Sequence, residues 1–317
     1  MPPEVNAQTE NSIIASPVNV RQLQHTSDWG QEQMKSFRMS LKSEEWASKF
    51  YNKYLYEEAK NIIVELPLGP ENYKDLPAVQ KPFLNRLLRL KRYPHYPGVS
   101  IASVLLEHTG FETEKLNCIA QPKLEKKFGD LTLISDADYV AIGPLSPLAY
   151  MVVIEDLSGK KTFDERRHQM VGDMLVAATT RHNFFLQNES YDISPHIYGM
   201  LLWKSGVRFY QATFDHQDID NRQSKRTFYY KDIDILENRC VPLGNNHKDS
   251  LSLFNADDGK IIAYILSGIR KECVNRLSYL FYKAKQSKKL ELIIAEVHVN
   301  IHGHSVLALF LAFQTPY

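Results

Sequence analysis

The middle of the chain carries the clearest pattern of apolar and polar positions. Short apolar runs, separated by glycine, proline and aspartate, predict a β-meander of three strands followed by two further strands. The runs are 131–134, 139–142, 150–154, 196–203 and 207–214. Lys204, Ser205 and Gly206 join the last two runs and predict a hairpin turn. Apolar residues at helical spacing predict helices over 101–109 and 164–181.

The first third of the chain has a different pattern. Residues 1–28 are polar and lack periodicity, which predicts an unstructured leader. The region 29–99 is predicted to be helical, with two helices that meet near Ser43, a candidate N-cap. Residues 76–92 predict an amphipathic helix with a basic face. That face is either a solvated surface or a contact for a phosphate backbone.

The last third predicts an α+β extension, residues 216–317, packed on the central part of the chain. A long helical pattern covers 260–284. Alternating apolar and polar residues over 290–301 predict a half-exposed strand. The region is therefore predicted to contain regular secondary structure, but its pattern indicates no catalytic or binding role.

Three histidines near the C-terminus form a candidate metal site. His298, His302 and His304 would project from one face if a strand continued through Gly303, and neutral imidazoles bind transition metals. Gly303 favours a turn instead. An exposed polar strand is therefore the preferred interpretation.

Composition limits the classes of function. The 38 Lys and Arg nearly balance the 37 Asp and Glu, so only a local basic patch could mark a nucleic-acid partner. Glycine-rich phosphate loops, GxSxG elbows and HExxH helices are absent. No stretch approaches the roughly 20 apolar residues of a membrane helix, and the first residues lack the pattern of a secretory signal. We therefore expect a cytoplasmic or nuclear protein without membrane contact.

Two carboxylates stand at the ends of expected strands. Asp138 precedes the apolar run 139–142, and Glu155 ends the run 151–154. Carboxylates that converge from adjacent strands can hold Mg²⁺ or Mn²⁺, which prefer oxygen ligands and activate water for phosphodiester hydrolysis. Each residue also has a plain alternative, since Asp138 is suited to a turn and Glu155 to the exit of a strand into solvent.

The order of helix, two strands bearing carboxylates, helix and hairpin resembles the core of the restriction-endonuclease-like PD-(D/E)xK nuclease superfamily. The resemblance covers residues 100–215. Its motifs lie in 135–142, in 151–156, in the helix with Gln169 and in the hairpin 197–210, which is similar to fungal and Crinkler-effector-type members. It implies an α/β fold with a mixed central sheet flanked by helices, and Asp138 and Glu155 as metal ligands.

The resemblance implies roles for further residues. Glu107 matches an additional acidic metal ligand of some members, and Gln169 matches a glutamine that faces the site. A lysine two positions after the second carboxylate normally positions water or stabilises charge on the phosphate. Leu157 occupies that position here. Three alternatives remain: Lys160 or Lys161 supplies a displaced lysine, Arg166 on the following helix substitutes for it, or catalysis is lost.

Two functions follow as hypotheses. The first is a Mg²⁺-dependent nuclease, or a nuclease-derived protein that binds nucleic acid, with DNA favoured over RNA by the resemblance. The second is a catalytically inactive nuclease-fold protein that binds a protein partner as a scaffold or effector. Leu157 and the balanced net charge favour the second, whereas the acidic pair favours the first. The sequence leaves the oligomeric state open.

Overall fold

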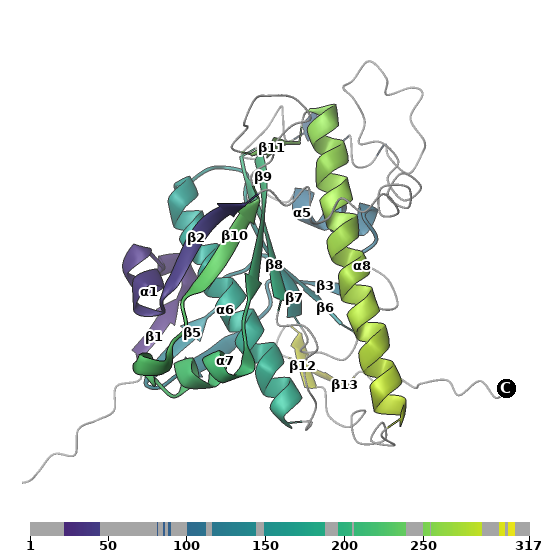
Figure 1. Ribbon diagram of the computed structural model, residues 1–317. Coiled ribbons are helices and arrows are strands. Elements are labelled where there is room, and N and C mark those ends of the chain that lie inside the picture. Colours follow the sequence, from purple (N-terminus) through teal and green to yellow (C-terminus); the bar gives the residue numbers. More distant parts are fainter. Residues whose placement is uncertain are drawn as a thin grey trace, which may run out of the picture.

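The structure is a computed structural model in which most of the central part of the chain is described. The described residues are 22–44, 100–111, 116–143, 149–187, 196–204, 206–238, 250–253, 255–286, 298–301 and 304–307, with the helical positions 81, 85, 88 and 89. They form a mixed central sheet with helices on both faces and two smaller sheets (Figure 1).

The central sheet has the strand order β2-β10-β9-β8-β7-β6-β3, and β11 pairs with one end of β9. The strands are β2 (Met39–Glu44), β3 (Asn117–Ala120), β6 (Tyr139–Ile142), β7 (Ala149–Asp156), β8 (His196–Trp203), β9 (Gly206–Thr213), β10 (Ile233–Asn238) and β11 (Leu251–Ser252). The pairs β7–β8 and β10–β2 are parallel and the others are antiparallel. Parallel neighbours need a crossover, which α6 (Phe163–Gln187) supplies between β7 and β8. The predicted mixed sheet flanked by helices is therefore confirmed.

Helices bury both faces of this sheet. One face packs against α6, and the other against α5 (Ile101–His108) and α8 (Ala256–Gln286), so α6 and α8 lie on opposite sides (Figure 1). Along β7, Met151 and Val153 join the cluster of α5 and α8, whereas Val152 and Ile154 join that of α6. Burial on both faces explains why β7 is an uninterrupted apolar run in the sequence. The helices predicted in these three regions are confirmed, with longer ends in α6 and α8.

A three-stranded sheet contains two departures from the predicted pattern. Its order is β1 (Gln22–His25), β5 (Leu131–Ile134), β4 (Glu125–Phe128). The meander prediction is wrong for β5, because β5 pairs with β1 and β4 rather than with β6. Residues 22–28 are predicted to belong to an unstructured leader, but they form β1 and the 3-10 turn η1 (Thr26–Asp28). Both departures come from the pairing of β1 with a strand that lies far along the chain.

The helix predicted to begin near Ser43 is also corrected. That residue lies in β2, which pairs in parallel with β10 and follows the short helix α1 (Gln31–Ser36). Since β2 and β10 both lie outside 100–215, the sheet extends beyond the range predicted for the core. The basic amphipathic pattern over 76–92 falls almost wholly outside the described residues.

The remaining elements are short. After β9 come α7 (His216–Gln223) and η3 (Thr227–Tyr229), and β12 (His298–Ile301) pairs with β13 (His304–Leu307) in a separate antiparallel sheet. His302 lies outside the described residues. In the described part of the chain, no group of three or more histidine, cysteine or acidic residues is arranged to hold a metal ion. No helix described there is long and apolar enough to cross a membrane.

Candidate functional site

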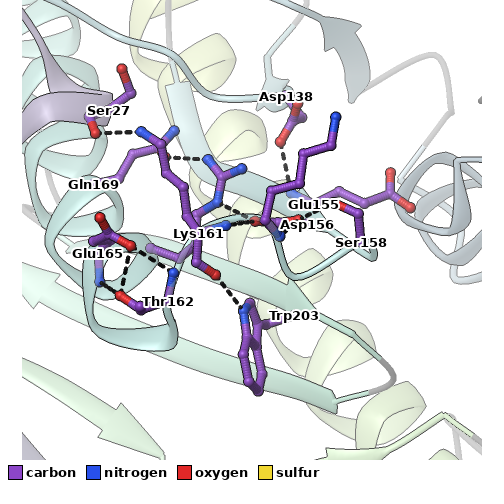
Figure 2. A network of polar contacts seen from close by, with 12 residues as sticks. Ser27, Asp138, Glu155, Asp156, Ser158, Lys161, Thr162, Glu165, Gln169 and Trp203 are labelled. Carbon is purple, nitrogen blue, oxygen red and sulfur yellow. Dashed lines mark hydrogen bonds and ion pairs between the residues drawn. The ribbon is translucent and has the colours of Figure 1, made fainter. Parts of the chain in front are cut away.

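The structure brings Asp138 and Glu155 together where β6 begins and β7 ends. These strands are antiparallel, with Tyr139 opposite Val153, so the start of one lies beside the end of the other. The carboxylate of Asp138 accepts a hydrogen bond from the backbone N–H of Glu155 at 2.7 Å (Figure 2). The backbone N–H of Asp138 donates to the carbonyl of Val153 at 2.9 Å. The position of Asp138 is thus fixed by the strand pairing itself.

The carboxylate of Glu155 binds the N-terminus of α5. Its Oε1 accepts hydrogen bonds from the N–H groups of Ile101 at 2.6 Å and Ala102 at 3.4 Å. Its Oε2 accepts one from the Ser100 hydroxyl at 2.7 Å. The first amides of a helix lack partners within the helix, and the helix dipole favours an anion beside them. Glu155 therefore fastens α5 to the end of β7.

Burial raises the pKa of both carboxyl groups. For Asp138, burial is the largest cause, and the hydrogen bond from the N–H of Glu155 and the charge of Arg166 oppose it. For Glu155, burial is again the largest cause, the donors at the start of α5 oppose it, and the charge of Asp138 raises the pKa further. Each carboxylate is therefore costly to ionise here, and a cation bound between them would relieve that cost.

The two residues offer oxygen donors of the kind that a divalent cation prefers, with the carboxylate of Glu155 turned to the start of α5. Among the described residues nothing hydrogen-bonds to Oδ1 of Asp138. Glu155 accepts three hydrogen bonds, fewer than the roughly four lone-pair sites of a carboxylate. Mg²⁺ binds through one or two carboxylates and retains several waters, whereas a structural Zn²⁺ takes about four protein ligands. The type of donor therefore matches the preference of Mg²⁺ or Mn²⁺ rather than that of a structural Zn²⁺.

A pocket adjoins Asp138. Its volume is about 510 Å³, and residues 121–125 and 134–138 line it. Lys123 and Asp136 are among the lining residues, so the wall carries both signs of charge. Asp138 therefore has room beside it for a ligand, and Glu155 is not among the lining residues.

Glu107 lies apart from this pair. It is exposed near the C-terminal end of α5, whereas Glu155 holds the N-terminal end of the same helix. At 1.5 Å per residue, roughly 9 Å of helix axis separates Glu107 from Ile101. The structure does not bring this residue to the two strand carboxylates.

The lysine position of the motif and the two replacement lysines have different surroundings. Leu157 is partly buried and packs against the apolar cluster under α5 and α8. The ammonium of Lys161 donates to the carbonyl of Ser27 at 2.6 Å, which ties it to η1 (Figure 2). Lys160 is exposed, and its ammonium has no partner among the described residues. Of these side chains, Lys160 is therefore the one whose charge is available to a ligand.

Gln169 belongs to a second polar network, on the α6 side of β7. Asp156 follows Glu155 and points to the opposite face of the sheet, as successive strand residues do. It accepts a hydrogen bond from Nε of Arg166 at 2.8 Å, and Arg166 also donates to Oε1 of Gln169 at 2.6 Å. The Gln169 amide, 1% exposed, in turn donates to the carbonyl of Asp136 at 3.0 Å. Figure 2 shows this network beside the acidic pair, with Gln169 engaged by protein groups.

The sequence analysis missed Asp173, a carboxylate at the centre of this network. Asp173 is fully buried and accepts hydrogen bonds from the hydroxyls of Thr26 at 2.6 Å and Ser135 at 2.7 Å. The backbone N–H of Asp136 donates to it at 3.0 Å. Burial raises the pKa of Asp173 to about 7. The available signal was an aspartate on the apolar face of a helix, where an ionisable residue needs partners.

A scan against protein-family models finds no matching family, and a search of the curated proteins finds no match. The protein is therefore described by its fold and its candidate site. It is an α/β protein with a mixed sheet between helices, which carries two half-buried acidic residues at the start of β6 and the end of β7.

Proposed function

We propose that this chain is a nuclease-like protein of the PD-(D/E)xK type that binds and cleaves nucleic acid, DNA rather than RNA, with Asp138 and Glu155 as ligands of Mg²⁺. The observation that carries the proposal is that the carboxylate of Asp138 contacts the backbone N–H of Glu155 and that Asp138 lines a pocket of about 510 Å³. Burial raises the pKa of both carboxyls, which favours the binding of a cation. Their placement on adjacent strands agrees with what the family resemblance implies.

The residues around the pair suit phosphate chemistry. When bound, Mg²⁺ supplies an activated water and stabilises the charge that develops on the phosphate. Oδ1 of Asp138 and the carboxylate of Glu155 would hold the ion. The exposed ammonium of Lys160, in the turn after β7, and that of Lys123, in the pocket wall, would attract the phosphate. The buried Gln169 network would keep the loop that carries Asp138 in place.

Metal binding and cleavage can be tested together. We expect calorimetric titration of Mg²⁺ or Mn²⁺ into the wild type to give saturable binding, weakened at least about tenfold in Asp138→Asn and Glu155→Gln, with plasmid nicking lost in parallel. Asp138→Asn is the cleaner variant, because Glu155→Gln also loosens α5. Glu107→Gln is the matched control and should behave as the wild type. A folded wild type with neither metal binding nor nicking contradicts the proposal.

The packing of Leu157 supports a second candidate function. We propose as the alternative a catalytically inactive nuclease fold that binds a protein partner as a scaffold or effector, since an apolar residue occupies the lysine position and packs into the apolar cluster. Leu157→Lys separates the two functions. If the acidic pair is catalytic, this variant should nick DNA at least about tenfold faster than the wild type, at a cost in stability of roughly 1–3 kcal/mol. A folded Leu157→Lys protein that binds no metal and nicks no DNA supports the scaffold function.

A further inference from the structure

The segment 223–231, which begins at the last residue of α7, presents two aromatic side chains to solvent. Phe228 is 93% exposed and Tyr229 is 68% exposed, and both lie in η3. Lys225 and Arg226 precede them and are exposed as well. We call this segment the aromatic-basic loop. Large apolar side chains that are exposed next to cations mark a candidate binding surface.

Buried contacts hold the aromatic-basic loop in place. Tyr230 is buried next to the exposed pair, and its ring lies 4.8 Å from the guanidinium of Arg222 and 6.5 Å from the ring of Phe37. Arg222 is itself fully buried and donates to Asp218 at 2.6 Å and to the carbonyl of Lys231 at 2.7 Å. The two exposed aromatics therefore sit on a fixed base, which lowers the ordering cost of binding a ligand.

β4 continues this surface towards the acidic pair. The backbone N–H of Gly129 donates to the carbonyl of Gln223 at 2.8 Å, so the loop lies against the turn that follows β4. Lys127 and Lys123 are exposed along β4 and its approach, and Lys123 lines the pocket beside Asp138. At about 3.3 Å per residue, the path from this turn to Lys123 is at most about 20 Å. One extended ligand could therefore touch both the loop and the pocket.

We propose that the aromatic-basic loop and the exposed face of β4 form a track for single-stranded nucleic acid that leads to the acidic pair. Bases would stack on Phe228 and Tyr229, while Arg226 and Lys127 would contact phosphates. The identity of this polymer rests on the proposed function of the acidic pair. The inference adds a surface outside the pair that binds single strands.

The charges on the track fit this ligand better than a membrane or a protein. Five exposed cations outnumber two exposed carboxylates along residues 123–130 and 223–231. They are Lys123, Lys127, Lys225, Arg226 and Lys231, and the carboxylates are Glu125 and Asp130. Lys225 pairs with Asp130 at 3.1 Å, which leaves Arg226 as the cation closest in sequence to the aromatics without an ion pair among the described residues. Cations in line with two flat side chains match a polymer that alternates anions with planar bases. A bilayer would need a broader apolar surface than two rings provide.

Fluorescence anisotropy of the full chain with labelled oligothymidylate and oligouridylate tests the track. We expect the double variant Phe228→Ala, Tyr229→Ala to raise the Kd about tenfold or more. Arg226→Ala should lower the slope of log Kd against log salt concentration by about 0.7. The matched control is Leu23→Ala, because Leu23 is 62% exposed and lies on β1, at the other edge of the same small sheet. This control should leave the Kd within about twofold of the wild type.

The outcomes separate this inference from the function on which it rests. If the double variant binds both oligonucleotides as tightly as the wild type while Asp138→Asn loses metal binding, the track is wrong and the metal site stands. If the double variant loses oligonucleotide binding while Asp138→Asn retains metal binding, the track stands and the metal site is wrong. Binding to anionic lipid vesicles that depends on the aromatic pair, without binding to either oligonucleotide, also overturns the track.

Discussion

At the scale of single residues, the alternation of side chains along β7 decides the surroundings of each carboxylate. Glu155 and Asp156 are neighbours in the sequence, yet Glu155 contacts the start of α5 and Asp156 contacts Arg166 on α6. The opposite faces of a strand explain the difference. The sequence places Asp138 and Glu155 correctly at strand ends, but the capping of α5 by Glu155 depends on Ser100, which lies 55 residues earlier. Contacts over such distances leave no periodic signal.

Asp173 gives a prediction about pH. Burial raises the pKa of its carboxyl to about 7, from the ordinary value of 3.8. Between those values the folded protein holds a proton that the unfolded chain has lost, so the stability that this proton contributes falls as the pH rises towards 7 and beyond. Asparagine does not titrate. The free energy of unfolding of the wild type minus that of Asp173→Asn should therefore fall by roughly 2–3 kcal/mol from pH 5 to pH 8.

Urea unfolding at several pH values measures this difference. The contact with Asp136 raises the pKa of His25, which also removes stability as the pH rises through its folded value. Both proteins contain His25, so its contribution cancels in the comparison. A difference that stays constant between pH 5 and pH 8 would show that Asp173 does not titrate in this range.

At the scale of elements, the sequence predicts a strand or helix well where the apolar residues of that segment alone determine its structure. The bounds of β6 and β8 equal the predicted runs 139–142 and 196–203, because buried strands are continuous apolar segments between turn residues. The local pattern does not predict which strands pair with each other. β2 pairs with a strand 194 residues later, measured from Ser40 to Asp234, and β5 pairs with β1. Such pairing overrides the local preference that suggests a helix start at Ser43.

The packing of α6 on β8 gives a prediction for one glycine. A Cβ atom at Gly199 would lie 2.6 Å from Sδ of Met170 and 3.1 Å from Sδ of Met174 and from Cβ of Tyr210. The methionine ends can shift, but they do so inside a filled core. We expect Gly199→Ala to lower the free energy of unfolding by about 1–3 kcal/mol, measured by urea unfolding.

A second glycine provides the comparison. A Cβ atom at Gly30 would meet only Oε1 of Gln33, at an ordinary 3.5 Å, so Gly30→Ala should change stability by less than about 1 kcal/mol. Adding Met170→Leu, which shortens the side chain above Gly199, should recover part of the loss in Gly199→Ala. Equal stability of Gly199→Ala and wild type would mean that α6 is free to move away from the sheet.

At the scale of the whole molecule, Arg222 joins segments that are far apart in the sequence. Its guanidinium is fully buried and donates to the Asp218 carboxylate at 2.6 Å, to the carbonyl of Lys231 at 2.7 Å and to the carbonyl of Phe37. Arginine does not lose its charge in proteins, so its burial depends on these acceptors. The end of α1, helix α7 and the segment before β10 are therefore held as one unit, which also supports the aromatic-basic loop.

Removal of this cation should destabilise the whole chain. Arg222→Met leaves the carboxylate of Asp218 buried without its partner, and we expect the free energy of unfolding to fall by roughly 3–5 kcal/mol in urea. Asp218→Asn combined with Arg222→Met should recover part of that loss, because no unpaired charge remains buried. Lys35→Met, which breaks an exposed ion pair with Glu32 at 3.2 Å, should cost less than about 1 kcal/mol. If the single and double variants are equally destabilised, the loss comes from packing around the guanidinium, and the buried charge pair is not what joins the segments.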